Sequence, residues 1–161
     1  MKKTCFLFVL LAIASLAQAN FSQNEKELTI KTARALETAP LSSETIKMRE
    51  KALKWVIETD EVHLTVCGEI FGFFSDKKNK NSSDMTGSYT IGMAAFKLEF
   101  ADKATDENAA QLAGLNTALK TYEAIIKEKP KNKFDKIDAL LAKRDSGQLA
   151  AMVNAADCSK K

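Results

Sequence analysis

Apolar residues recur at helical spacing along most of the chain, and no other feature constrains the fold as strongly. Residues 105–130 show the clearest pattern, in which large apolar side chains follow steps of three and four residues: Leu112, Leu115, Leu119, Tyr122 and Ile126. Thr105 or Asp106 is placed to cap this helix, and Pro130 is expected to end it. The pattern is too short for a coiled coil, so packing inside a helical bundle is the better interpretation.

Further segments carry the same periodicity and are separated by turn residues. Residues 20–40 have the most modest apolar face, although Ser22 and Glu25 have capping-box spacing. Only two prolines occur in the 161 residues. The chain is therefore predicted to be all-α, a single-domain bundle of five to seven helices. Besides the helix above, helices are expected over residues 22–39, 42–58, 82–100, 134–147 and 148–156.

The segment 61–74 fits two patterns. Alternate residues from Val62 to Val66 are apolar, as in a strand. Four apolar residues also fall at four-residue steps, as in a helix: Val62, Val66, Ile70 and Phe74. Because a lone strand is only marginally stable and no second alternating segment is present to pair with it, we expect a helix here.

Residues 75–84 contain no large apolar residue, and they predict a solvated loop. Three lysines make this loop a candidate interaction surface: Lys77, Lys78 and Lys80. The acidic and amide residues of the loop lack the spacing and the turn glycine of a calcium-binding EF-hand, so no ion site is expected. No aromatic platform accompanies the lysines, which favours solvation over phosphate binding.

The first nineteen residues are typical of an export signal. Lys2 and Lys3 precede an apolar run over residues 5–16, and the small-residue motif Ala17-Gln18-Ala19 follows. The run of about twelve residues is shorter than the roughly twenty that a membrane-spanning helix needs. We expect cleavage after this motif, which leaves residues 20–161 as a single helical domain without a membrane span, in the periplasm or outside the cell.

Cleavage also changes the charge of the protein. The formal net charge of the full chain is +3, and removal of Lys2 and Lys3 with a segment that has no acidic residue lowers it to +1. A nearly neutral domain without a basic aromatic face gives little support to nucleic-acid binding. No nucleic-acid partner is therefore expected.

The cysteines predict one disulfide. Cys5 lies in the export signal, so an oxidising compartment would receive only Cys67 and Cys158. A bond between them would pin the C-terminal tail to the middle of the chain, and closing so long a loop stabilises a fold by about 4–5 kcal/mol in the chain-entropy description. The alternative is a nucleophilic Cys67 paired with His63 one helical turn earlier, but the sequence offers no group to orient that histidine.

The sequence contains no recognisable catalytic or cofactor motif. One histidine and one pair of cysteines do not supply a typical zinc site, and there is no G-x-S-x-G elbow, phosphate-binding glycine loop or dinucleotide fingerprint. No cofactor, metal or enzymatic activity is expected, although carboxylate-only sites leave no such motif. Five aromatic residues are core or, as the less favoured alternative, line a small-molecule pocket: Trp55, Phe71, Phe74, Tyr89 and Phe96.

Three stretches carry a resemblance to known proteins. They are Trp55-Val56-Ile57 through Thr65-Val66-Cys67, residues 113–119 with 122–125, and residues 140–147. In these stretches the chain resembles exported helical proteins of environmental bacteria that have no assigned activity. The resemblance implies a bacterial envelope location and no particular reaction. In architecture alone, the chain is also similar to small periplasmic immunity proteins, which are exported, helical and disulfide-pinned.

These observations favour a noncatalytic periplasmic or secreted protein that binds a protein partner through a helical face or through the lysine loop. An immunity or inhibitor protein is a specific version of this hypothesis. A small-molecule-binding helical protein is the alternative from another functional class. The sequence leaves the partner and the oligomeric state open.

Overall fold

The described part of the chain, residues 22–156 and 158 of a computed structural model, is helical and contains no strand. The predicted all-α bundle is confirmed, and the predicted export signal lies outside the described residues. Two short 3-10 helices, Ala101–Lys103 and Pro130–Asn132, connect longer elements. The seven α-helices of the described part are an N-terminal helix over residues 22–38, α2 (Ser43–Glu58), α3 (Gly68–Phe74), α4 (Ser82–Glu99), α5 (Glu107–Glu128), α6 (Asp135–Asp145) and α7 (Leu149–Ala156).

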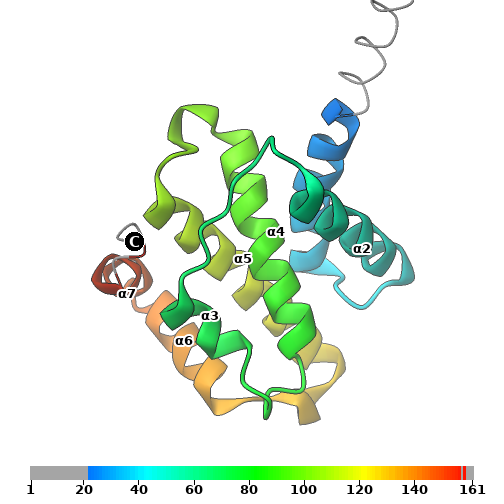
Figure 1. The fold of residues 1–161 in the computed structure, drawn as a ribbon. Helices are drawn as coiled ribbons and strands as arrows, with labels where there is room; N and C mark the ends of the chain where they lie inside the picture. Colours follow the sequence, from blue (N-terminus) through cyan, green and yellow to red (C-terminus); the bar gives the residue numbers. More distant parts are fainter. Residues whose placement is uncertain (1–21, 157, 159–161) are drawn as a thin grey trace, which may run out of the picture.

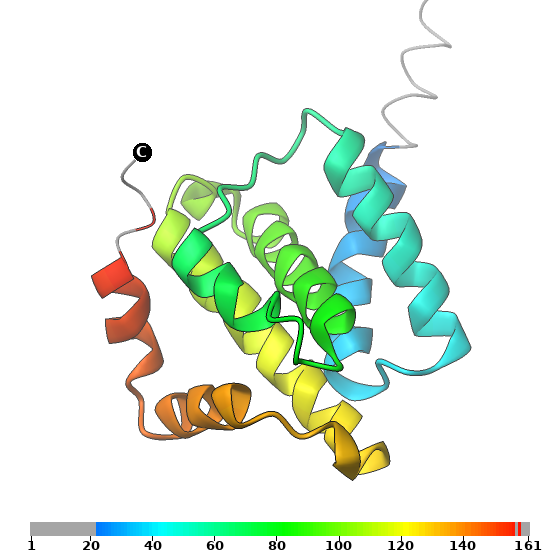
Figure 2. The same cartoon turned by 60° about the horizontal axis from the view of Figure 1, so that its bottom comes forward.

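The two longest of these helices, α4 and α5, form the centre of the fold as an antiparallel hairpin (Figures 1 and 2). The N-terminal helix and α2 lie on one side of this pair, and α3, α6 and α7 lie on the other. The peripheral helices therefore surround a central hairpin whose two helices are consecutive in the sequence. This is a simple way to build a small bundle.

Helix α4 is buried on nearly all sides. Ten of its 18 residues are buried, and a helix that is apolar around its whole circumference must lie inside the molecule. Tyr89 packs with the core toward α3 and α6, whereas Ile91 packs with the core toward the N-terminal helix. Ala94 belongs to a third cluster with Val56 and Val62. The helix thus joins three apolar clusters into one interior.

Two glycines allow α4 and α5 to approach closely. A Cβ atom on Gly114 of α5 would lie 2.6 Å from both the Tyr89 carbonyl oxygen and the Met93 Cγ atom. A Cβ atom on Gly92 of α4 would lie 2.7 Å from the Thr117 Cβ atom. Real Cβ atoms cannot occupy such positions without displacing their neighbours, so only glycine permits this crossing.

The helix ends follow from local sequence. The Ser42 hydroxyl accepts a hydrogen bond from the Thr45 N–H at 3.1 Å, and the Asp106 carboxylate accepts one from the Ala109 N–H at 2.9 Å. Both are N-cap bonds that satisfy a donor left unpaired at a helix start. After α6, Gly147 adopts a φ of +73°, the left-handed conformation that glycine supplies most readily. These boundaries agree with the predicted ones.

The predicted helix over residues 61–74 is wrong in its first half. Only Gly68–Phe74 is helical, and residues 62–67, here called the strap, have no regular secondary structure. They run as a drawn-out length of chain (Figure 1) to Cys67, whose φ of −82° and ψ of 112° are extended. Side chains hold this segment, because Lys97 and Gln111 donate hydrogen bonds to the carbonyl oxygens of His63 and Thr65. The four-residue spacing therefore predicted a helix that the structure does not have over residues 62–67, and the alternating pattern does not correspond to a strand there.

The loop after α3 is more structured than the predicted solvated loop. It ends at Asn81, and both Asn79 and Asn81 are buried. The Asn81 amide donates to the Asn132 carbonyl oxygen at 2.8 Å, and the Asn132 amide donates back to the Asn81 side-chain oxygen at 2.9 Å. This reciprocal pair ties the loop to the 3-10 helix Pro130–Asn132, because buried amides need such partners.

Candidate functional site

The predicted disulfide is present. Cys67 and Cys158 are bonded, with 5.2 Å between their Cα atoms, and both residues are buried. The bond joins the end of the strap to the residue that follows α7 by two positions. It also removes the alternative of a nucleophilic Cys67, since its sulfur is bonded and His63 is not on a helix with it.

The three lysines proposed as an interaction loop are all exposed: Lys77, Lys78 and Lys80. The loop is fixed at its base by Asp76. One Asp76 oxygen accepts from the Lys78 N–H at 2.9 Å, and the other pairs with Lys136 of α6 at 2.7 Å. The Lys136 hydrogen bond, with that of the Lys78 amide, lowers the pKa of Asp76. The bonds of Asp76 therefore fix the backbone from which the three lysine side chains extend.

The five predicted core or pocket aromatics do not surround one cavity. Phe71 and Phe74 lie beside Tyr89 in the main core, with ring centroids 6.5 and 5.4 Å from that of Tyr89. Trp55 belongs instead to the cluster of Val56, Val62 and Ala94, and Phe96 lines a charged cleft. Phe71, Phe74 and Tyr89 are therefore core residues and do not line a pocket together.

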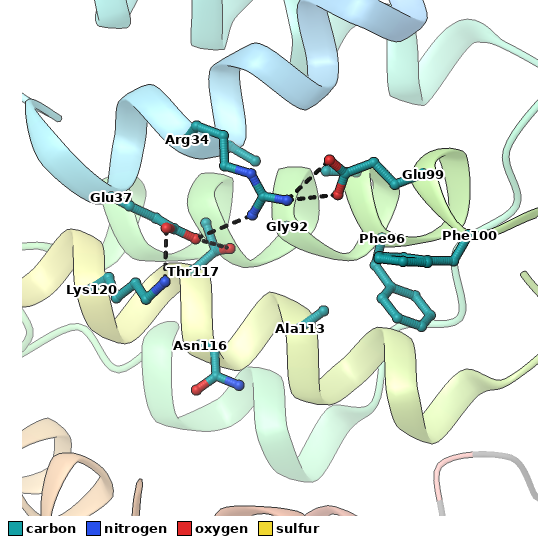
Figure 3. Close-up of a pocket in the computed structure, with 12 residues that line it drawn as sticks. Arg34, Glu37, Gly92, Phe96, Glu99, Phe100, Ala113, Asn116, Thr117 and Lys120 are labelled. Atoms are coloured by element: carbon teal, nitrogen blue, oxygen red, sulfur yellow. Dashed lines mark hydrogen bonds and ion pairs between the residues drawn. The ribbon is translucent and has the colours of Figure 1, made fainter. Parts of the chain in front are cut away.

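The charged cleft lies where the N-terminal helix, α4 and α5 meet (Figure 3). It has a volume of about 170 Å³. Its lining includes three small residues: Gly92, Ala95 and Ala113. Its polar side chains come from all three helices: Arg34, Glu37, Glu99, Thr117 and Lys120. The sequence did not predict this group, because the residues that bond across the cleft are 65 or more positions apart.

The charges of this cleft neutralise one another. Arg34 Nη2 lies 3.0 and 2.7 Å from the two carboxylate oxygens of Glu99. Glu37 accepts from the Thr117 hydroxyl at 3.1 Å and from Lys120 Nζ at 2.9 Å. The cleft is also smaller than the roughly 300–1,000 Å³ of typical ligand pockets. Its arrangement is therefore suited to holding three helices together, and it offers little to a ligand.

A second polar site lies under the strap. The Lys97 ammonium, whose side chain is only 5% exposed, donates to the His63 carbonyl oxygen at 2.8 Å and pairs with Glu107 at 2.6 Å. Burial of a charge is costly unless it is paired and hydrogen-bonded, and Lys97 is both. Gln111, fully buried, donates to the Thr65 carbonyl oxygen one turn further along α5. These two side chains hold the inner edge of the strap.

The cavity at the start of the strap has a volume of about 320 Å³. Its lining includes Val62, His63, Lys97 and Glu107, and one Glu107 oxygen is buried without a hydrogen-bond partner within the described residues. Glu61 at its rim receives hydrogen bonds from Lys26 and Ser22 of the N-terminal helix, which lower the pKa of the carboxyl group. The start of the strap is thus fixed from two directions.

Sequence reasoning missed Lys97, although a signal for it existed. It is the one charged residue in the apolar stretch from Met85 to Leu98, and a lone lysine in such a stretch requires a buried partner. Within residues 22–156 and 158, no cluster of three or more histidine, cysteine, aspartate or glutamate side chains is placed to hold a metal ion. In the same part of the chain, no helix is long and apolar enough to cross a membrane.

Comparison of the chain with protein-family models, with curated proteins and with solved structures finds no significant match.

Proposed function

We propose that this protein is a noncatalytic helical module that binds another protein in the bacterial periplasm or outside the cell. The observation that carries the proposal is the strap, an extended segment that is fixed on its inner edge and runs along the surface between α2 and α3 (Figures 1 and 2). Binding segments are commonly irregular chain held by a rigid scaffold. Here the α4–α5 hairpin is that scaffold.

The disulfide supports the proposed location. Disulfides persist in oxidising compartments and are rare in the cytosol. A bond between Cys67 and Cys158, which remain after removal of residues 1–19, is consistent with export by the signal pattern of those residues. Location and binding are separate proposals, and each has its own test.

A small-molecule-binding function is the second candidate. The cavity beside the strap supports it, because its volume of about 320 Å³ falls within the range of ligand pockets. A ligand there would meet the Lys97–Glu107 pair and the apolar surface of Val62. The same pair is already used to anchor the strap, which is why protein binding is the preferred proposal.

Affinity capture tests the protein-binding proposal. The tagged, oxidised protein over residues 20–161 is immobilised and exposed to an envelope extract. We expect one protein to be retained in roughly equimolar amount and released by untagged protein. If no retained protein is displaced by the untagged competitor, the proposal is wrong, and thermal-shift screening of small molecules against the strap cavity becomes the next test. Cell fractionation of the full-length chain tests the location.

A further inference from the structure

The outer edge of the strap has an unpaired backbone. In an extended chain the N–H and C=O groups of one residue point to the same edge, and successive residues alternate between edges. The carbonyls of His63 and Thr65 face Lys97 and Gln111. Val62, Leu64 and Val66 must therefore direct their backbone groups to the opposite edge, where they form no hydrogen bond with any described residue.

The edge is also held in position before any partner arrives. Val62 is buried at one end, and Cys67 is fixed by the disulfide at the other. Because both ends and two carbonyls are anchored, little further backbone entropy is lost when a second strand pairs with this edge. Val66 remains 52% exposed, so its side chain is available to contact that strand.

From this geometry we infer that the outer edge of the strap binds an extended segment of the partner protein by β-strand addition, and that this segment is basic at its ends. This inference rests on the proposed protein-binding function. Main-chain hydrogen bonds provide affinity in this mode of recognition, and alternate side chains provide specificity. One exposed acidic residue that forms no ion pair with a described residue flanks the strap at each end, Asp60 before it and Glu69 after it, and these two determine the charge of the segment that fits.

The same charges disfavour a second copy of the chain as the occupant. Antiparallel pairing of two straps would bring Asp60 of one copy close to Glu69 of the other. Like charges opposite each other across a strand pair are destabilising. A lysine-ended segment of another protein places opposite charges at both positions.

Two synthetic peptides test the inference. Both have a central stretch of alternating valine and threonine, and one ends in lysines and the other in glutamates. We expect the lysine-ended peptide to bind the oxidised protein, and the glutamate-ended peptide to bind at least about tenfold more weakly, a difference of about 1.4 kcal/mol. Equal affinity of the two peptides, or no binding of either, would overturn the inference.

Substitutions at residues 65 and 66 separate backbone pairing from side-chain contact. Val66→Pro removes an outer N–H and is compatible with an extended chain, so we expect the lysine-ended peptide to bind at least about tenfold more weakly. Val66→Thr keeps the N–H and is expected to bind within about threefold of the native protein. Thr65→Pro removes an inner N–H and serves as the proline control. If Val66→Pro and Thr65→Pro weaken binding equally, outer-edge pairing is wrong.

Two further measurements keep the alternatives distinct. Thermal unfolding verifies that each variant folds, and sedimentation of the free protein over a range of concentrations reports self-association. A dimer that Val66→Pro dissociates would assign the edge to a second copy and overturn the inference. If a partner captured from the extract is retained equally by native protein and Val66→Pro, the inference fails while the proposed function stands.

Discussion

The crossing of α4 and α5 and the strap show two ways of holding chain segments together. At the crossing, contact depends on shape, since Gly92 and Gly114 leave no room for another side chain. At the strap, contact depends on individual bonds from Lys97 and Gln111 and on the Cys67–Cys158 disulfide. A packed crossing has no free backbone groups to offer, whereas a segment fixed by bonds on one edge leaves its other edge available. This difference places the candidate binding surface at the strap.

Removal of the disulfide should have the largest effect. In the variant Cys67→Ala with Cys158→Ala, we expect the free energy of unfolding to fall by about 4 kcal/mol, because the bond closes a long loop in the unfolded chain. Denaturant unfolding of the variant and of the native oxidised protein measures the difference. Reduction of the native protein is the control and should reproduce it. A loss below about 1 kcal/mol would show that the strap and tail are held by packing alone.

Substitution at the crossing should follow in size. Gly114→Ala forces a Cβ atom against backbone at 2.6 Å, and we expect it to lower the free energy of unfolding by about 3 kcal/mol. Gly72→Ala is the matched control, because its Cβ atom would meet nothing within 4 Å on α3. That variant should be more stable than the native protein by about 0.5–1 kcal/mol. Similar effects at both glycines would contradict the close approach of α4 and α5.

Substitution of one lysine at the strap and one in the charged cleft compares the contributions of the two sites to stability. Lys97→Met removes the buried partner of Glu107 and should cost about 2 kcal/mol, since the remaining carboxylate is largely buried. Lys120→Met, in the cleft, should cost less than about 1 kcal/mol, because that side chain is half exposed. Denaturant unfolding of the two variants measures both. If Lys120→Met lowered the free energy of unfolding more than Lys97→Met, the stability of the protein would depend more on the bonds of the cleft than on those of the strap.

The two buried tyrosines should have the smallest effect on stability near neutrality, because their contribution to the pH dependence appears in alkali. Burial raises the pKa of Tyr122 to about 12, and it also raises that of Tyr89. Unfolded tyrosines ionise near pH 10. Because the unfolded state releases these protons first, the tyrosines should lower stability as the pH rises between about pH 10 and 12. Spectrophotometric titration checks this: the chain has two tyrosines, and phenolate absorbance near pH 10 in folded protein would contradict their burial.

Much of the fold could be predicted from local sequence. Helix ends at Ser42, Asp106 and Gly147 depend on residues within one turn, so their chemistry is visible in the chain itself. The disulfide was predicted for a different reason. Once Cys5 is assigned to the export signal, Cys67 has only one possible partner in the chain.

The strap and the charged cleft could not be predicted, because their partners are distant in sequence. His63 is held by Lys97, which lies 34 positions later, and Thr65 by Gln111, 46 positions later. No local pattern reveals such a bond. The same holds for Arg34 and Glu99, which are 65 positions apart. Over residues 62–67 neither the alternating nor the four-residue apolar pattern identified the irregular segment, because it is held by those distant side chains.

Residue-specific hydrogen–deuterium exchange of the oxidised protein over residues 20–161 tests the central claim most directly. We predict fast exchange of the Leu64 and Val66 amides in the free protein, and strong protection of the Tyr89 and Leu115 amides in the central hairpin. Addition of the lysine-ended peptide should then slow exchange at Leu64 and Val66. Protection of these two amides in the free monomer, or no change when the peptide is bound, would contradict the account of the strap as an open edge.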